Sequence, residues 1–291
     1  MNTILITGAN TGIGRACAEQ LAAPGVRLIL ACRSRERTQP VLAELERRGA
    51  VAEFLPLDLG DLAGAAAAAK SFARANRSLD VLINNAGLAG ARGLTSAGYE
   101  LAFGTNHLGH FAFTLPLLPL LEAARGRIVN VSSGSHYRAP GINFEQLRTP
   151  TRTKTGLDEY GVSKLCNILF TAELRRRHPQ ITAVSLHPGR IASDVWRNVP
   201  AFFRPVLRWA LRMESVHAGG AAVVHALQAQ APKDGGELPL YFHVQQPRPP
   251  SRAAQREELA AELWRYSMDA VSDRSEAPLA SEPLRPHAAT T

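Results

Sequence analysis

Short apolar runs rich in Val, Ile and Leu recur along this 291-residue chain, and stretches with helical spacing separate them. The runs lie at residues 3–8, 26–33, 51–59, 79–87, 126–134, 181–189 and, more weakly, 238–244, and helical candidates at 14–23, 37–49, 62–76 and 163–179. Strands that are apolar throughout are typical of parallel sheets covered on both faces. The alternation therefore predicts an α/β fold, a Rossmann-type doubly wound parallel sheet of about seven strands with helices on both faces.

Two segments interrupt this alternation. Residues 135–159 are polar and contain two prolines, and residues 194–215 combine aromatic side chains with arginines. Long connections inside a compact domain are usually functional. We expect a single domain over 1–272, with a substrate lid at about 190–215, and a disordered tail over 273–291, where Pro, Ala, Ser and Glu dominate.

The composition is that of a globular protein, with 45% hydrophobic and 20% charged residues. The three cysteines are too scattered for a metal cluster and do not pair evenly, which favours a reduced, cytoplasmic compartment. The longest apolar stretch, residues 110–121, contains two prolines and is shorter than the roughly 20 residues that span a membrane. We therefore expect a soluble protein without a transmembrane span.

The formal net charge of +8 is compatible with nucleic-acid binding, yet the arginines are spread along the chain and no recognisable nucleic-acid-binding module accompanies them. We predict no nucleic-acid partner. A basic balance also suits an enzyme that binds a polyphosphate cofactor.

A glycine-rich turn, TGANTGIG, follows the first predicted strand and precedes a predicted helix, with glycines at Gly8, Gly12 and Gly14. Glycine allows a tight turn and a close approach of the backbone to a pyrophosphate, which the helix N-terminus attracts. This turn is predicted to bind a dinucleotide through Gly8, Asn10, Thr11, Gly12, Ile13 and Gly14.

The ends of the second and third predicted strands bear on the type of cofactor. Arg33 stands where an NAD-specific site has Asp or Glu, and with Arg15 it predicts pairing with the 2′-phosphate of NADP. NAD is the weaker alternative, and the other interpretation is that Arg33 and Arg35 are solvated surface charges. Asp58 can accept a hydrogen bond from the adenine amino group, with Leu59 nearby, or can cap the following helix.

Tyr160 and Lys164 lie four positions apart in a predicted helix and so share one face. This spacing is common by chance on solvated helices. It also allows the lysine charge to lower the pKa of the phenol, which would suit proton transfer at a carbonyl near neutral pH.

Several motifs occur in an order and spacing that resemble the short-chain dehydrogenase/reductase family, over about residues 1–244: TGANTGIG, NNAG, NHLGHF, VNVSSG, YGVSK and HPGRIASDV. The resemblance implies a nicotinamide cofactor and a catalytic set of Asn106, Ser133, Tyr160 and Lys164. In that family pattern Tyr160 exchanges the proton, Ser133 holds the substrate oxygen, Lys164 also binds the nicotinamide ribose, and Asn106 holds a water. The motifs further imply cofactor contacts from Asn85, Ala86, Gly87, Tyr160, Lys164, Pro188, Gly189 and Ile191.

The long 135–159 segment and the block from residue 241 to 267 are similar to the retinol-dehydrogenase-like branch of that family. The resemblance implies NADP(H) and a lipophilic carbonyl or alcohol substrate, with contacts from Ser133, His136, Trp196, Phe202 and Phe203. Aromatic and aliphatic residues between 196 and 211 predict an apolar pocket wall, although weak contact with a membrane surface is an alternative.

We therefore expect an NADPH-dependent oxidoreductase that interconverts a ketone or aldehyde and an alcohol. The alternatives are a non-catalytic dinucleotide-binding scaffold and an NAD-linked alcohol dehydrogenase. No metal site is expected, because no carboxylate or cysteine is spaced to join His107 and His110. A homo-oligomer through the helices near 101–121 and 160–177 is compatible with the family pattern.

Overall fold

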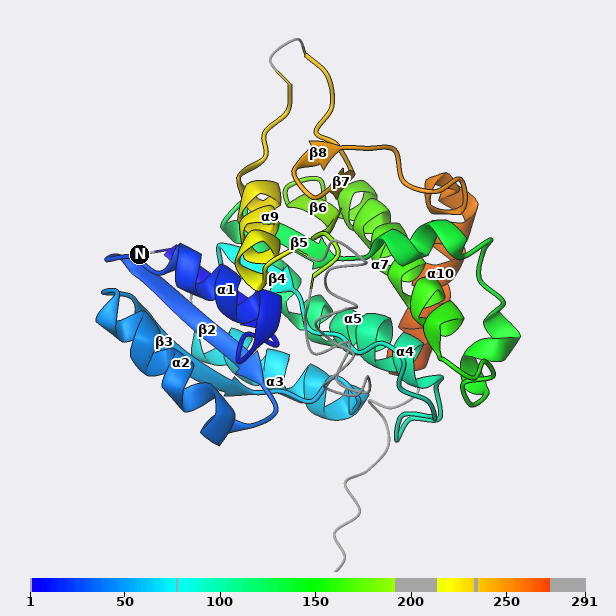
Figure 1. The fold of residues 1–291 in the computed structure, drawn as a ribbon, viewed down its shortest axis with the longest axis horizontal. Helices are drawn as coiled ribbons and strands as arrows, with labels where there is room; N and C mark the ends of the chain where they lie inside the picture. Colours follow the sequence, from blue (N-terminus) through cyan, green and yellow to red (C-terminus); the bar gives the residue numbers. More distant parts are fainter. Residues whose placement is uncertain (1, 77, 192–213, 233–234, 273–291) are drawn as a thin grey trace, which may run out of the picture.

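The computed structural model describes residues 2–76, 78–191, 214–232 and 235–272. Within these residues, eight strands form one sheet in the order β3-β2-β1-β4-β5-β6-β7-β8 (Figure 1). The strands are β1 (Asn2–Thr7), β2 (Val26–Cys32), β3 (Val51–Pro56), β4 (Val81–Asn84), β5 (Arg127–Val131), β6 (Thr182–His187), β7 (Tyr241–His243) and β8 (Gln246–Pro247). The predicted doubly wound α/β sheet is confirmed, and its strand order reverses between β1 and β4.

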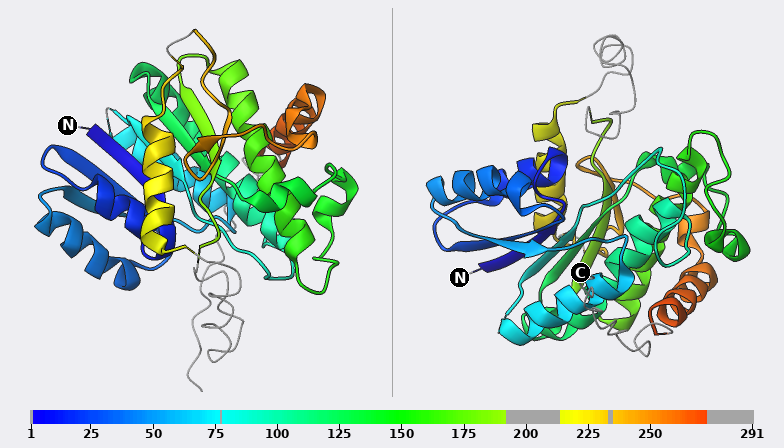
Figure 2. Two further views of the ribbon diagram at one scale, coloured as in Figure 1. Left: turned by 45° about the horizontal axis from the view of Figure 1, so that its top comes forward. Right: turned by 90° about the horizontal axis from the view of Figure 1, so that it is seen from below.

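Helices cover both faces of the sheet, as the two further views in Figure 2 show. The α-helices are α1 (Gly12–Leu21), α2 (Arg35–Arg47), α3 (Leu62–Ala75), α4 (Leu101–Phe103), α5 (Gly109–Thr114), α6 (Leu118–Ala123), α7 (Leu157–Arg177), α9 (Val216–Gln228) and α10 (Glu257–Ser272). The shorter turns are the π-helix η1 (Gly104–Leu108) and the 3-10 helices η2 (Leu115–Leu117), η3 (Gly134–Arg138), η4 (Phe144–Arg148) and η7 (Ala253–Gln255).

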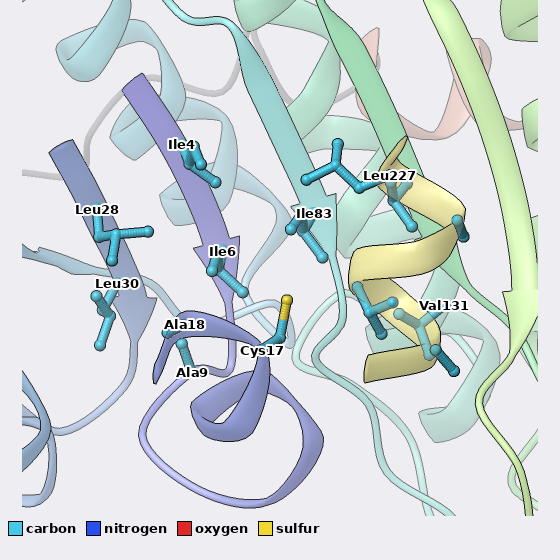
Figure 3. Packing of buried hydrophobic residues seen from close by; sticks show 14 of the residues in the cluster. Ile4, Ile6, Ala9, Cys17, Ala18, Leu28, Leu30, Ile83, Val131 and Leu227 are labelled. Atoms are coloured by element: carbon cyan, nitrogen blue, oxygen red, sulfur yellow. The ribbon is translucent and has the colours of Figure 1, made fainter. Parts of the chain in front are cut away.

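Alternate positions of the central strands supply two separate cores. Ile4 and Ile6 lie in one buried cluster with residues of α1 and α9 (Figure 3), and residues of α2 belong to the same cluster. Leu5 lies in a second cluster with residues of α3, α5 and α7 on the other face. A fully buried Leu or Ile side chain contributes roughly 1.5–3 kcal/mol relative to exposure. Strands that are apolar at successive positions therefore need a helical layer on each side.

The last strand pair differs from the expectation of a fully parallel sheet. β8 runs antiparallel to β7, and the two-residue connection contains Val244, whose φ of 58° lies in the left-handed region. Such a tight hairpin reverses the chain without a crossover helix. It leads the chain back towards η3, where Ser251 donates its backbone N–H to His136.

Helix α10 covers part of α7 and η1. The centre of the Trp264 ring lies 5.0 Å from the centre of the Phe111 ring and 6.0 Å from that of Phe170. The Arg177 guanidinium lies 4.8 Å from the centre of the Trp264 ring. No described helix combines the length and apolar character needed to cross a membrane.

Candidate active site

The glycine-rich turn joins β1 to α1 at the edge where the parallel strands end. Gly8 has a φ of 66°, and a Cβ there would lie 2.9 Å from the Cβ of Ala86. A Cβ on Gly14 would lie 2.6 Å from the carbonyl oxygen of Gly8. The turn is thus pressed against the end of β4 and tolerates no side chain at either position.

Gly12 has a φ of 58° but faces open space, with nothing within 4 Å of the position of a Cβ. It begins α1, which has no acidic residue in its first turn. A ten-residue helix that starts behind such a turn directs backbone N–H groups towards an anion. The predicted residues Asn10, Thr11 and Ile13 are half-buried on the same turn.

The NNAG segment ties three strands together. Asn84 donates from its side chain to Asn130 at 2.9 Å, which joins β4 to β5. Asn85 donates from its side chain to the carbonyl oxygen of Thr7 at 3.0 Å, and the backbone N–H groups of Asn85 and Ala86 donate to the Thr7 hydroxyl at 3.0 Å each. These bonds hold the glycine-rich turn against the end of β4.

At the end of β2 the two neighbouring arginines have different environments. The Arg35 guanidinium lies 4.7 Å from the centre of the Phe54 ring, whereas Arg33 is exposed and has no ion pair with any described residue. Arg15, also exposed, pairs with Glu19 at 2.7 Å. Arg33 therefore remains the better candidate for a 2′-phosphate.

The alternative that Asp58 caps the following helix is wrong. Asp61 caps α3 by accepting the Gly64 N–H at 3.0 Å, while Asp58 is exposed and accepts the Gly60 N–H at 2.9 Å. The side chain of Leu59 is buried in the core, so only its backbone can face a ligand.

The four side chains expected to act together are brought together. Ser133, at the end of β5, lies near enough to the phenol of Tyr160 on α7 to lower the pKa of that phenol. The Lys164 Nζ lies 5.7 Å from the centre of the Tyr160 ring and donates to the carbonyl oxygen of Val131 at 3.0 Å. Asn106 completes the group, because a Cβ on Gly87 would lie 3.2 Å from Asn106 Oδ1 and 3.3 Å from Lys164 Nζ.

The pKa of Tyr160 departs from its ordinary value in the direction opposite to our expectation. Burial raises the pKa of the phenol, and the nearby Ser133 side chain opposes that rise. Burial also lowers the pKa of Lys164 to about 8. Removal from water is the main cause of both pKa shifts, and the ammonium hydrogen-bonds the carbonyl oxygen of Val131, with Nζ 5.7 Å from the centre of the Tyr160 ring.

The Asn106 side chain is committed to the protein. Its Oδ1 accepts the Leu88 N–H at 2.9 Å, and its Nδ2 donates to the Leu88 carbonyl oxygen and to the Ser163 hydroxyl, both at 2.9 Å. Asn106 therefore clamps the segment after β4 onto α7, next to Lys164. A water at Asn106 would have to use the remaining lone pair of an oxygen.

His136 lies directly behind Ser133. Its Nδ1 lies 2.7 Å from the Ser133 carbonyl oxygen and its Nε2 accepts the Ser251 N–H at 3.1 Å. Because both ring nitrogens are occupied by backbone groups, His136 braces the Ser133 turn rather than presenting a free group to a substrate.

The segment after β6 approaches the glycine-rich turn. Pro188 is buried and Gly189 has a φ of 101°. Ile13 and Ile191 meet at Gly219 of α9, where a Cβ would lie 3.0 Å from the Cγ1 atom of each. The predicted cofactor contacts on these two loops are thus neighbours. Trp196, Phe202 and Phe203, nearly all of the lid at about 190–215, and the tail over 273–291 lie outside the described residues.

Two histidines near Ser133 were not predicted as site residues. His187 and His243 are register partners on β6 and β7, with ring centres 4.9 Å apart, and a Cβ on Gly134 would lie 3.5 Å from His187 Nε2. The Nδ1 atoms of both rings are buried and have no hydrogen-bond partner among the described residues. The HPG and YFHV motifs mark their positions, but only the parallel pairing of β6 and β7 shows that they meet.

The fold and the site define a Rossmann-type α/β protein whose sheet edge carries a glycine-rich turn beside a Ser-Tyr-Lys cluster. The family profile described as short chain dehydrogenase matches residues 2–144. Human retinol dehydrogenase 14 is 35% identical over 289 residues, which cover 91% of this chain and 84% of that protein. The chain therefore belongs to the short-chain dehydrogenase/reductase family, in its retinol-dehydrogenase-like branch.

Two further relatives show the extent of the similarity. The human protein named dehydrogenase/reductase SDR family member 13 is 36% identical over 254 residues, which cover 84% of this chain but only 62% of that relative. A crystal structure of an uncharacterised protein from Mycobacterium paratuberculosis shares 33% identity, with a TM-score of 0.73 and coverage of 94% of each chain.

Proposed function

We propose that this protein is an NADP(H)-dependent oxidoreductase that interconverts a ketone or aldehyde with the corresponding alcohol on a lipophilic small molecule. The observation that carries the proposal is the Tyr160 phenol at the sheet edge that carries the glycine-rich turn, with Ser133 nearby and with Lys164 Nζ 5.7 Å from the centre of its ring. A non-catalytic scaffold would have no need of a positioned proton donor.

The residues of this edge fit a dinucleotide. The first turn of α1 and the open face of Gly12 suit the pyrophosphate, and Asp58 keeps a carboxylate oxygen for the adenine amino group. Ile13 and Ile191 offer an apolar surface further along the same edge. When bound, the nicotinamide supplies or accepts the hydride.

NADP(H) is favoured over NAD(H) by the charge at the end of β2. Arg33 is exposed and has no ion pair with a described residue, while its neighbour Arg35 stacks on Phe54. A guanidinium pairs well with a phosphate, whereas the diol of NAD is bound by Asp or Glu at this place in the fold.

The protein's own groups favour reduction. Because burial raises the pKa of Tyr160, the phenol stays protonated near neutral pH and is ready to give its proton to the oxygen of a carbonyl substrate. Ser133 is placed to hydrogen-bond the same oxygen. The Lys164 ammonium, close to the ring, stabilises the phenolate that forms as the proton leaves.

A lipophilic substrate is supported by the composition of the segment around 196–211 and by the names of relatives such as human retinol dehydrogenase 14. The match covers only 62% of SDR family member 13, so this relative does not define what the present chain binds.

The proposal is tested by measuring NADPH and NADH binding by fluorescence titration and then NADPH oxidation against a panel of lipophilic aldehydes and ketones. We expect tighter binding of NADPH and turnover with at least one member of the panel. Absence of binding of either dinucleotide would reject the proposed function.

A further inference from the structure

A buried hydrogen-bond chain links the glycine-rich turn to Asn106 through a residue outside the expected site, His110. The first group in this series of hydrogen bonds is the hydroxyl of Thr7, which is the last residue of β1. This hydroxyl accepts the backbone N–H groups of Asn85 and Ala86. The same hydroxyl lies 2.9 Å from His110 Nε2.

The direction of each bond in this chain follows from the partners. His110 Nδ1 lies 2.9 Å from the carbonyl oxygen of Asn106, and a carbonyl only accepts, so Nδ1 carries the proton. Burial lowers the pKa of His110 to about 4, so the ring is neutral and Nε2 accepts. The Thr7 hydroxyl donates to it in preference to the Ile83 carbonyl oxygen, which is 3.5 Å away.

The far end of the chain lies in an unusual helical turn. Asn106 is part of the π-helix η1, in which Gly109 donates its backbone N–H to Gly104, five residues earlier. π-Turns inside helices often occur at functional sites. Here the Asn106 carbonyl receives its bond from the side chain of His110, while the Asn106 carboxamide holds Leu88 and Ser163.

His107 provides a natural comparison one turn earlier. It is equally buried, but its Nε2 contacts Ser267 of α10 at 2.9 Å, and its ring packs between Phe103 and Phe111. It contacts neither Thr7 nor the Asn106 carbonyl in the described residues, so it serves the packing of α10.

We propose that His110 is a positioning residue that couples the dinucleotide-binding turn to the Asn106 clamp beside Tyr160 and Lys164. The inference rests on the proposed function. The imidazole accepts the Thr7 hydroxyl through Nε2 and donates from Nδ1 to the carbonyl oxygen of Asn106 in η1. Displacement of either end therefore changes the bond at the other end.

The two bonds can be removed separately. His110→Asn places an amide N–H where Nδ1 lies and keeps the bond to Asn106, but it cannot reach Thr7. His110→Gln places an amide near the position of Nε2 and keeps the bond to Thr7, but it loses Asn106. His110→Phe keeps the ring volume and loses both, and His107→Phe is the control for the loss of a buried imidazole.

The test measures the NADPH dissociation constant, kcat and KM on the most active substrate of the panel, and Tm. With one buried hydrogen bond removed, we expect His110→Asn to weaken NADPH binding about fivefold with kcat within about twofold. His110→Gln should lower kcat about tenfold with NADPH binding within about twofold, and His110→Phe should show both losses. His107→Phe should change neither, even where its Tm falls. Losses of NADPH affinity and of kcat that only parallel the fall in Tm would overturn the inference. Equal losses in the Asn and Gln variants would also overturn it.

Hydrogen exchange of the backbone over residues 84–88 in the ligand-free protein separates this inference from the proposed function. His110→Asn should speed exchange severalfold, because Thr7 loses the acceptor that orients its hydroxyl, and His110→Gln should not. Absence of dinucleotide binding in the wild type would reject the proposed function and leave this readout in place. Exchange that is unchanged in His110→Asn and His110→Phe would overturn the coupling itself.

Discussion

Lys164 is the residue at which stability and the proposed activity oppose each other most clearly. Its ammonium is buried and its pKa is lowered to about 8, so the folded state holds a charge that the unfolded state solvates better. The lowered pKa means that folding is disfavoured by this group below about pH 8 and that the penalty disappears as pH rises towards the ordinary lysine value of about 10.4.

Lys164→Met should therefore unfold at higher urea concentration than the wild type at pH 7, by up to about 3 kcal/mol of unfolding free energy. The carbonyl of Val131 keeps a donor, since Asn167 also bonds it at 3.2 Å. The difference should shrink in titrations near pH 10, and turnover should be lost at both pH values. A variant less stable than the wild type at pH 7 would contradict this description of the buried charge.

Arg33 decides the proposed preference for NADPH. Arg33→Asp should lower the ratio of NADPH to NADH affinity about tenfold or more, because one charge-assisted pair is replaced by repulsion. Fluorescence titration of both dinucleotides measures the ratio.

Arg35→Asp is the matched control for that experiment. It makes the same change of charge two residues away. The Arg35 side chain stacks on Phe54, whereas the Arg33 side chain is exposed after the end of β2. An equal shift of the ratio in both variants would show that general charge, and not a contact of Arg33, sets the preference.

At the scale of elements, α10 protects the helices that carry the site. Trp264 is 8% exposed and packs on Phe111 of α5 and Phe170 of α7. A homo-oligomer through α5 and α7 would have to accommodate α10, which already contacts both helices.

Trp264→Ala should lower the unfolding free energy by about 3–5 kcal/mol, as measured by urea denaturation, because the cavity would open between three helices. Met268, on the same helix, is 36% exposed, and Met268→Ala should change stability by less than about 0.5 kcal/mol. A loss at Trp264 as small as that at Met268 would show that α10 is not an integral part of the core.

At the scale of the whole molecule, the doubly wound sheet was predictable because apolar residues at successive strand positions require two helical layers. The grouping of Ser133 with Tyr160 and Lys164 was expected from the resemblance of the motifs to a family pattern. Strand ends at one edge of a parallel sheet explain the place of Ser133 but not that of α7.

Features that depend on tertiary contacts were not predictable from local sequence. Asp58 and Asp61 are both able to cap a helix, and only the path of the chain selects Asp61. The direction of the pKa shift of Tyr160 depends on the removal of the phenol from water, which only the packing of distant segments around it decides. His110 and the hairpin at Val244 likewise follow from packing between segments far apart in sequence.

The most direct test of Tyr160 as the proton donor is a comparison of the wild type with Tyr160→Phe, which removes the phenol oxygen and keeps the ring. NADPH binding by fluorescence titration and initial rates of NADPH oxidation with the best substrate of the panel are measured on both. A general acid contributes about 100-fold or more to the rate, so we predict a loss of that size with the NADPH dissociation constant within about twofold. A Tyr160→Phe variant that turns over at the wild-type rate would contradict the assignment of Tyr160 as the proton donor.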